Sequence, residues 1–155
     1  MKIVFIASTG GHLEELLQLK PLFEKNDSYL ITEKTKSTES LKNQYGEKVS
    51  FLVYGSKDHL FTYLFKFLFN SLKSFYLFLK IRPKVIVTTG THTAVPLCYI
   101  AKLFGRKIIF IETFANINSK TLSGRLVYPI ADLFIVQWEE LLELYPKAIY
   151  GGWIF

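Results

Sequence analysis

The chain opens on a short apolar segment that runs directly into two glycines, a histidine and a helical pattern. Residues 2–7 are apolar after the first lysine, the loop 8–12 reads Ser-Thr-Gly-Gly-His, and leucines recur with helical spacing over residues 13–19. A strand, a glycine turn and a helix start form the first β–α unit of a doubly wound sheet. Glycines allow close backbone approach to a ligand, and free N–H groups at a helix start favour an anion. The pattern predicts a binding or active loop at residues 8–12.

The remaining sequence alternates between strand and helix patterns. Apolar runs predict strands near residues 2–7, 28–32, 49–54, 84–88, 107–111, 133–136 and 148–150. Helical patterns lie near residues 13–25, 58–81, 92–104, 121–129 and 138–145, and the polar segment 33–47 predicts a loop with one short helix. Continuous apolar strands that alternate with helices are typical of parallel sheets covered on both faces. We therefore expect residues 1–155 to form a single Rossmann-like α/β domain with a mostly parallel sheet.

Composition narrows the classes of partner. Half of the 155 residues are hydrophobic, only 21% are charged, and the net charge is +6. A positive charge suits a nucleic acid or an anionic membrane surface, but the basic residues follow no RNA-binding motif, so we expect no nucleic-acid partner. Cys98 lies in an apolar run and predicts a buried thiol in a reducing compartment. Because we find no signal peptide and no run of 18 apolar residues, we expect a peripheral protein on the cytoplasmic side of the cell membrane.

The helix predicted to end at residue 81 is unusually apolar. Between residues 60 and 81, 15 of the 22 residues are apolar and eight of these are Phe or Tyr. Its polar residues form one narrow stripe, so the apolar arc is far wider than a surface helix needs. One interpretation is a helix lying in the plane of the bilayer surface. The predicted membrane contacts are then Phe65, Lys66, Phe69, Lys73, Phe78 and Lys80. The alternative is a helix packed between the sheet and a neighbouring helix or subunit.

Two residues of the first loop and helix are the catalytic candidates. An unperturbed histidine titrates near neutral pH, so His12 is suited to act as a general base. The alternative is a helix-start residue that hydrogen-bonds the loop backbone. Glu15 follows one turn later, where it is placed either to orient the imidazole or to complement the helix dipole.

Further candidates lie at the ends of other predicted strands, where open α/β sheets bind ligands. Candidates for contact with an acceptor or a phosphate are Ser8, Thr9, Gly10, Gly11, Thr89, Gly90, Thr91, Glu112, Asn116 and Ser119. The alternative role for the later loops is simple capping of the helices that follow. The aspartates are isolated and no histidine pair has zinc spacing, so we expect no metal and no cofactor. An incomplete glycine fingerprint followed by Glu33 keeps a soluble dinucleotide-binding enzyme as a further alternative.

Several of these segments resemble a known family. The loop and helix start 8–15 resemble the GSGGHxxE loop of the membrane-anchoring, acceptor-side subunit of the eukaryotic dolichol-linked UDP-GlcNAc transferase, and also the GGTGGH turn of MurG. Residues 122–138 and 145–148 resemble the same subunit family, and the match runs nearly the whole chain. The similarity is greatest to the bacterial capsule and exopolysaccharide members of the PssD/CpsF type.

The resemblance implies a function. The chain would correspond to the N-terminal half of a GT-B glycosyltransferase, binding the membrane and a polyprenyl-pyrophosphate-linked sugar acceptor. A separate donor-binding subunit, similar to the C-terminal half, would hold the UDP-sugar, and transfer would need both. We expect a hexosyl- or N-acetylhexosaminyltransferase subunit for capsule or exopolysaccharide synthesis. The alternative from another class is a non-catalytic enhancer or membrane anchor of a partner transferase.

The resemblance also implies roles for particular residues. His12 matches a loop histidine that acts near the acceptor hydroxyl, Glu15 matches the loop glutamate, and Glu112 and Ser119 match an acidic-serine loop. The sequence departs from the family pattern at Asn116, where arginine is common, and at His92, where a glycine is usual. The eukaryotic members carry an N-terminal anchor that we do not find here, so the helix 60–81 is expected to contact the membrane. The last residues, 150–155, are expected to abut the donor-binding subunit.

Overall fold

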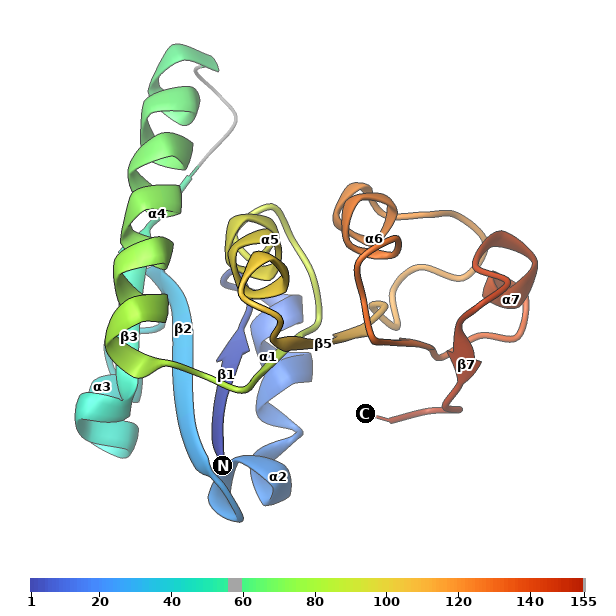
Figure 1. Cartoon of the computed structure of the whole chain (residues 1–155), viewed down its shortest axis with the longest axis horizontal. Helices are drawn as coiled ribbons and strands as arrows, with labels where there is room; N and C mark the ends of the chain where they lie inside the picture. Colours follow the sequence, from blue (N-terminus) through green and yellow to red (C-terminus); the bar gives the residue numbers. More distant parts are fainter. Residues whose placement is uncertain (56–59, 155) are drawn as a thin grey trace.

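The computed structural model describes residues 1–55 and 60–154, which form an α/β domain around one parallel sheet (Figure 1). The strands are β1 (Lys2–Ile6), β2 (Asp27–Lys34), β3 (Val49–Val53), β4 (Val85–Thr88), β5 (Lys107–Ile111), β6 (Leu133–Val136) and β7 (Ile149–Tyr150). The helices are α1 (Gly11–Leu17), α2 (Lys20–Glu24), α3 (Leu41–Tyr45), the 3₁₀ turn η1 (Gly46–Lys48), α4 (Leu60–Ile81), α5 (Val95–Leu103), α6 (Leu122–Val127) and α7 (Leu141–Leu144). The predicted fold class is confirmed.

The seven strands lie in the order β3-β2-β1-β4-β5-β6-β7, and every neighbouring pair is parallel. Successive side chains of a strand point to opposite faces, so the sheet carries two cores. Val4 and Ile6 pack toward α4, α5 and α6, whereas Ile3 and Phe5 pack toward α1. The strand order reverses direction between β1 and β4. In such sheets the ligand crevice opens at the carboxyl ends of the strands on either side of that point.

Some predicted boundaries were wrong for local reasons. The helix predicted at residues 13–25 is two helices, because a proline at position 21 lacks the N–H that an uninterrupted helix would need there. The segment 33–47 begins with the last residues of β2 and ends in α3 and part of η1, so it holds more structure than one short helix. The helix predicted at 92–104 begins at Val95, with Pro96 in its first turn, where proline is tolerated. Positions 58 and 59 lie outside the described residues.

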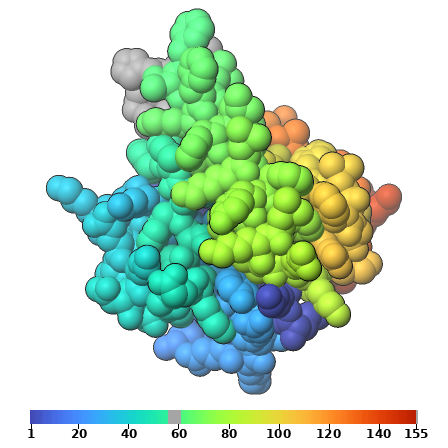
Figure 2. Space-filling view, turned by 60° about the vertical axis from the view of Figure 1, so that its left-hand side comes forward, coloured from blue at the N-terminus to red at the C-terminus, as the bar shows by residue number. Residues whose placement is uncertain are grey.

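Helix α4 is anchored at the β3 edge of the sheet and projects beyond it. Its N-terminal turns extend past the rest of the chain (Figure 1), and Figure 2 shows them standing clear of the body. Asn70 donates a hydrogen bond to the Val53 carbonyl and accepts one from the Val53 N–H, both at 2.8 Å. The C-terminal turns pack on the core through Leu77, Phe78 and Ile81. The helix is therefore held by its C-terminal half and by one asparagine.

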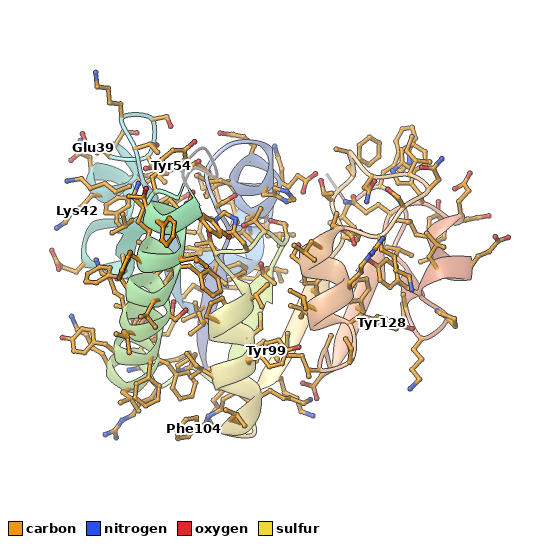
Figure 3. All side chains as sticks on the ribbon, turned by 90° about the horizontal axis from the view of Figure 1, so that it is seen from above. Glu39, Lys42, Tyr54, Tyr99, Phe104 and Tyr128 are labelled. Atoms are coloured by element: carbon orange, nitrogen blue, oxygen red, sulfur yellow. The ribbon has the colours of Figure 1, made fainter. Side chains whose placement is uncertain are left out.

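Helix α5 is the central helix on the same face. Its Cys98 is fully buried, and burial raises the pKa of the thiol to about 12, so this cysteine is an inert core residue. The Phe104 ring, just after α5, packs on Phe78 of α4 with centroids 5.0 Å apart. On the opposite side Tyr99 donates a hydrogen bond to the Leu126 carbonyl of α6 at 2.8 Å. Phe104 and Tyr99 are labelled in Figure 3, where α5 lies between α4 and α6.

Candidate functional site

The loops that follow β1 and β4 are joined directly across the point where the strand order reverses. The His12 Nδ1 atom lies 2.8 Å from the Thr89 carbonyl oxygen, and the Thr89 hydroxyl donates a 2.6 Å hydrogen bond to the His12 carbonyl. Thr89 is fully buried and His12 is half-buried, so the pair is shielded from water on the Thr89 side. The predicted first loop and the predicted β4 loop therefore form one site.

The bond to Thr89 defines the chemical state of the His12 ring. A backbone carbonyl only accepts hydrogen bonds, so Nδ1 must be the donor and carries the proton in the neutral ring. The Nε2 lone pair is then left to accept a proton or a hydrogen bond from a ligand. His12 is half-buried, so its ring is accessible from one side. His12 therefore hydrogen-bonds the loop backbone, as the structural alternative expected. Any role as a general base would fall to its Nε2 atom.

A second chain of hydrogen bonds links three loops. The Ser8 N–H donates to the Thr91 hydroxyl at 3.2 Å, and the Thr91 N–H donates to the Ser123 hydroxyl at the start of α6 at 3.1 Å. Thr91 has a φ of 75°, which a β-branched residue rarely adopts, and Gly90 before it has a φ of 109°. A methyl group on Gly90 would lie 3.1 Å from the Ser123 hydroxyl. The β4 loop is thus a tightly held, strained turn between the other two loops.

Glu15 does not orient the His12 ring, which was one of the two roles expected for it. One Glu15 carboxylate oxygen accepts hydrogen bonds from the Thr113 hydroxyl at 2.7 Å and from the Phe114 N–H at 3.0 Å. Its other oxygen is buried and has no hydrogen-bond partner among the described residues. Helix α1 turns this side chain toward the loop after β5. The imidazole is positioned instead by Thr89.

Its place at the end of β5 had suggested that Glu112 faces an open crevice, but it does not. The side chain is fully buried, and its carboxylate accepts hydrogen bonds from the Tyr145 hydroxyl at 2.9 Å and from Thr121 at 2.9 and 3.0 Å. Burial raises its pKa despite these bonds, the Thr113 N–H bond and the nearby charge of His12. Burial, followed by the Glu112 charge, also raises the pKa of Tyr145. Glu112 therefore holds the start of α6 in place from within the core, through its hydrogen bonds with Thr121.

The packing around Gly124 shows how closely the side chains of Glu112, Tyr145 and Thr121 surround the start of α6. A methyl group at Gly124 would collide with the Glu112 carboxylate and the Tyr145 hydroxyl and would lie 2.8 Å from the Thr121 hydroxyl. Thr121 caps α6 by accepting a 2.9 Å hydrogen bond from the Gly124 N–H. Thr121 and Tyr145 were not among the predicted site residues. A threonine three residues before a buried glycine was the available signal for the cap, whereas nothing in the sequence pairs residue 145 with residue 112.

The other predicted contacts fall into two groups. Gly10 and Gly11 are exposed, and neither has any atom within 4 Å of the position that a Cβ would occupy. Thr9, beside them, is half-buried, so this part of the loop offers open backbone to a ligand. Asn116 and Ser119 instead hydrogen-bond each other, with the Ser119 hydroxyl 2.7 Å from the Asn116 Oδ1 atom. They close a turn of the loop after β5 rather than joining the loops after β1 and β4.

The outer face of α4 is a continuous apolar surface. Its exposed large side chains follow the i, i+3, i+4 pattern of one helix face, at Phe61, Leu64, Phe65, Leu68, Phe69, Leu72, Phe75, Tyr76 and Leu79. Phe65 is 73% exposed and Phe69 53% exposed, as a membrane contact requires. Phe78 is only 4% exposed and belongs to the core, so its prediction as a membrane residue was wrong. Lys80 is exposed, whereas Lys66 and Lys73 are half-buried.

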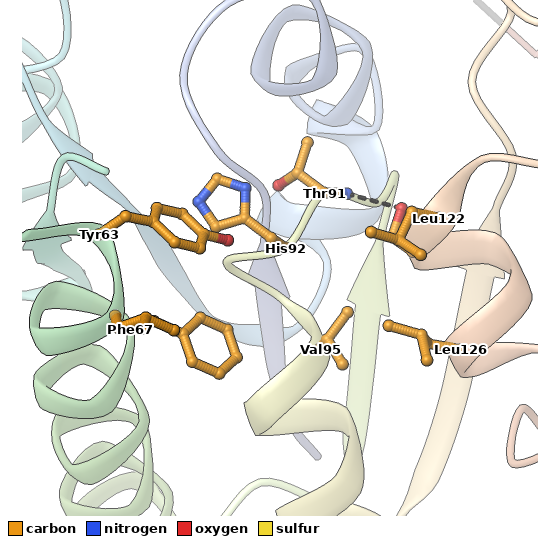
Figure 4. A pocket seen from close by; sticks show the side chains of 9 residues that line it. Tyr63, Phe67, Thr91, His92, Val95, Leu122 and Leu126 are labelled. Carbon is orange, nitrogen blue, oxygen red and sulfur yellow. Dashed lines mark hydrogen bonds between the residues drawn. The ribbon is translucent and has the colours of Figure 1, made fainter. Parts of the chain in front are cut away.

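An apolar pocket of about 430 Å³ lies between this helix and the site (Figure 4). Its lining residues are Tyr63, Leu64, Phe67, Thr91, His92, Val95, Leu122, Ser123 and Leu126. Buried Glu33 lies behind it, with one oxygen accepting a 2.7 Å hydrogen bond from Thr93 and lying 3.6 Å from the His92 Nε2 atom. Burial, followed by the Glu33 charge, raises the pKa of Tyr63. Glu33 thus serves this buried polar cluster, rather than standing free as a ribose-binding acid.

Within residues 1–55 and 60–154, no group of three or more His, Cys, Asp or Glu side chains is placed to hold a metal ion. None of the helices in the described parts of the chain is both long and apolar enough to cross a bilayer.

Comparison with solved structures shows the fold that this chain shares with other proteins. The solved structure of Acinetobacter baumannii MurG matches 90% of this chain over 42% of its own length, with a TM-score of 0.70 and 14% identity. A UDP-GlcNAc 2-epimerase from Methanocaldococcus jannaschii matches 97% of the chain over 45% of its length, with a TM-score of 0.72 and 15% identity. The chain therefore has the fold of one half of a GT-B glycosyltransferase or a related epimerase.

Comparison of sequences gives the family. The model of the family described as "Oligosaccharide biosynthesis protein Alg14 like" matches residues 2–154, so the chain belongs to the Alg14-like family. The mouse protein named UDP-N-acetylglucosamine transferase subunit ALG14 is 29% identical over 98% of this chain and 82% of its own length. The Candida albicans protein of the same name is 44% identical over 59% of this chain and 42% of its own length. The chain thus spans less than half of that fungal relative and of the two solved structures.

Proposed function

We propose that this chain is the membrane-side and acceptor-side subunit of a two-component UDP-sugar transferase. In this role it anchors and enhances a partner subunit that binds the donor, which is the alternative expectation drawn from the sequence. The donor assigned first is UDP-N-acetylglucosamine, because the relatives are named as subunits of a transferase for that sugar. The acceptor is a sugar carried on a polyprenyl pyrophosphate. Synthesis of a bacterial capsule or exopolysaccharide stays a prediction from the resemblance alone.

The observation that carries the proposal is the exposed apolar face of α4 beside the loops of His12 and Thr91. An apolar surface of this extent on a soluble domain is typical of a site that contacts a membrane or a protein. The four lysines and one arginine at positions 66, 73, 80, 82 and 84 favour an anionic lipid surface. A lipid-linked acceptor has its tail in the bilayer and its sugar at the surface. A subunit that contacts the bilayer through α4 would hold the site at the membrane surface, where the acceptor sugar lies.

A second candidate function is a direct catalytic contribution from His12. The observation in its favour is the Nε2 lone pair left free when Nδ1 donates to Thr89. A nitrogen in that state is able to take the proton from an acceptor hydroxyl as the hydroxyl attacks the sugar donor. Glu15 is already hydrogen-bonded elsewhere, so it would take no part in that step.

The experiment is a transfer assay with UDP-N-acetylglucosamine and a polyprenyl-pyrophosphate-linked sugar in lipid vesicles. The chain, a donor-binding partner subunit, and the two together are assayed separately. The proposal predicts that the mixture is at least tenfold faster than the partner alone and that the chain alone is inactive. An equal rate for the partner with and without the chain would contradict it.

A pair of variants distinguishes the two candidate functions. His12→Asn keeps an amide N–H close to the position of Nδ1 but has no Nε2 base, whereas His12→Ala loses both. If the chain only anchors and enhances, His12→Asn retains the stimulation of the mixture. If His12 is the base, His12→Asn loses at least a hundredfold in turnover while vesicle binding and complex formation are unchanged.

A further inference from the structure

The pocket between α4 and α6 has one apolar end and one polar end. Leu64 and Phe67 of α4 form one wall, and Leu122 and Leu126 of α6 form the facing wall. Val95 of α5 is drawn between these walls (Figure 4). The volume of about 430 Å³ is in the range of small-molecule sites, which are typically apolar with a few polar groups. The pocket therefore suits a hydrocarbon chain with a polar group at one end.

The polar end of the pocket meets the candidate site. Thr91 and Ser123 line it and are joined by the 3.1 Å hydrogen bond that runs from the Thr91 N–H to the Ser123 hydroxyl. A methyl group on Gly90 would lie 3.1 Å from the Ser123 hydroxyl and 3.7 Å from the His12 ring. The pocket and the His12 ring are thus separated by little more than the backbone of one glycine.

The other end of the pocket meets the exposed face of α4. Leu64 lines the pocket and is also 53% exposed on the apolar face, between Phe61 and Leu68. Leu122 and Leu126 on the opposite wall are 64% and 42% exposed. One apolar surface therefore continues from the outside of α4 to the edge of the His12 site. Such continuity is expected where a lipid leaves a bilayer to present its head group.

We propose that this pocket binds the lipid units nearest the phosphate of the polyprenyl-pyrophosphate acceptor. The inference rests on the proposed function and adds to it where the lipid lies. The bound chain would enter from the exposed face of α4, pass between Leu64 and Leu126, and end at Thr91 and Ser123. The acceptor sugar would then lie beyond the phosphates on the His12 side. The pocket would bind the first lipid units by excluding water from them rather than by pairing charges.

The test measures binding of farnesyl diphosphate to the purified full chain without vesicles or partner, by titration calorimetry. Leu126→Trp fills the pocket from its exposed rim, and Leu103→Trp is the matched control, because Leu103 is 84% exposed on α5 and does not line the pocket. We expect wild type and Leu103→Trp to bind alike and Leu126→Trp to bind at least tenfold more weakly. Inorganic diphosphate is expected to bind at least tenfold more weakly than farnesyl diphosphate.

The proposal would be overturned by an absence of farnesyl diphosphate binding or by equal binding by Leu126→Trp and Leu103→Trp. Equal binding of farnesyl diphosphate and inorganic diphosphate would also overturn it. A single-chain phospholipid that competes as well as farnesyl diphosphate would assign the pocket to ordinary membrane lipid instead. Vesicle binding and stimulation of the partner are measured on the same variants. If these persist while farnesyl diphosphate fails to bind, the pocket assignment fails and the proposed function stands.

Discussion

His12 and Thr89 are tied to each other by two hydrogen bonds, one from the ring to a carbonyl and one from a hydroxyl to a carbonyl. They come from loops that are 77 residues apart in the sequence and that follow the two strands where the sheet order reverses. The pair therefore joins the β1 and β4 loops at the place where ligands bind in sheets of this kind. It also presents a single ring nitrogen to any ligand.

We predict that the neutral His12 ring carries its proton on Nδ1. The reason is that the Thr89 carbonyl accepts and has no proton to give. Long-range nitrogen NMR of the labelled chain, at a pH where the ring is neutral, distinguishes the two tautomers. A ring protonated on Nε2 would contradict the geometry of the site and would remove the candidate base.

We predict that Asn70→Ala loosens α4 from the sheet. The substitution removes both 2.8 Å hydrogen bonds to Val53, so the free energy of unfolding should fall by about 1–3 kcal/mol. Urea unfolding measures the change. Lys66→Gln, one turn earlier on the polar stripe, is the control and should change stability by less than about 0.5 kcal/mol. Equal effects of the two variants would mean that Asn70 is not the anchor.

We predict that the stability difference between wild type and Glu112→Gln depends on pH. The folded-state pKa of Glu112 is raised, so the folded protein holds this proton to a higher pH than the unfolded chain, whose glutamates titrate near about 4.3. As pH rises from that value through the folded-state pKa, wild type loses stability relative to Glu112→Gln. Below pH of about 4 the two curves should run parallel. Urea unfolding of both proteins from pH 3.5 to 8 checks this, and a difference that grows in favour of wild type with rising pH would contradict it.

We predict that the double variant Phe65→Gln with Phe69→Gln leaves the fold intact and releases the chain from anionic vesicles. Both side chains are exposed, so their loss costs little stability but removes apolar contact with the bilayer. Co-sedimentation with phosphatidylglycerol-rich vesicles measures the release. Undiminished sedimentation would assign the face of α4 to a protein partner.

Phe78→Gln provides the contrasting control for the same helix. This ring is buried in the core and packs on Phe104, so its removal should destabilise the chain by about 3–5 kcal/mol. Thermal unfolding should separate it clearly from the Phe65 and Phe69 variants. The comparison shows whether loss of vesicle binding follows from the surface or from unfolding.

The sequence predicted what depends on local patterns. The glycine turn at 10–11, the alternation of strands and helices, and the wide apolar arc of α4 are all periodic or local signals, and the structure confirms the fold class they indicate. Which face of α4 turns outward was not predictable, because Phe65 and Phe78 look alike in sequence. The two rings differ because Phe78 lies on the face of the helix that packs on the core, whereas Phe65 lies on the outer face, which stays exposed even at Tyr76.

The hydrogen-bond partners of Glu15 and Glu112 could not be predicted from the sequence, because they lie on segments far away along the chain. Glu15 lies one turn from His12, which suggested a contact, yet it bonds the loop after β5, 98 residues away. Glu112 is satisfied by Tyr145, 33 residues further along the chain. Such bonds depend on the order of strands in the sheet. Spacing along one helix or loop carries no information about that order.

The most direct test of the proposed role compares one reaction on two acceptors. The rate of UDP-N-acetylglucosamine transfer by the donor-binding partner is measured with wild-type chain and with the Phe65→Gln and Phe69→Gln double variant. One acceptor is a long polyprenyl-pyrophosphate sugar in vesicles, and the other is a short-chain, water-soluble analogue. We predict that the double variant loses at least tenfold on vesicles and little on the soluble acceptor. Equal rates for wild type and variant on the vesicles would contradict a membrane-side and acceptor-side subunit.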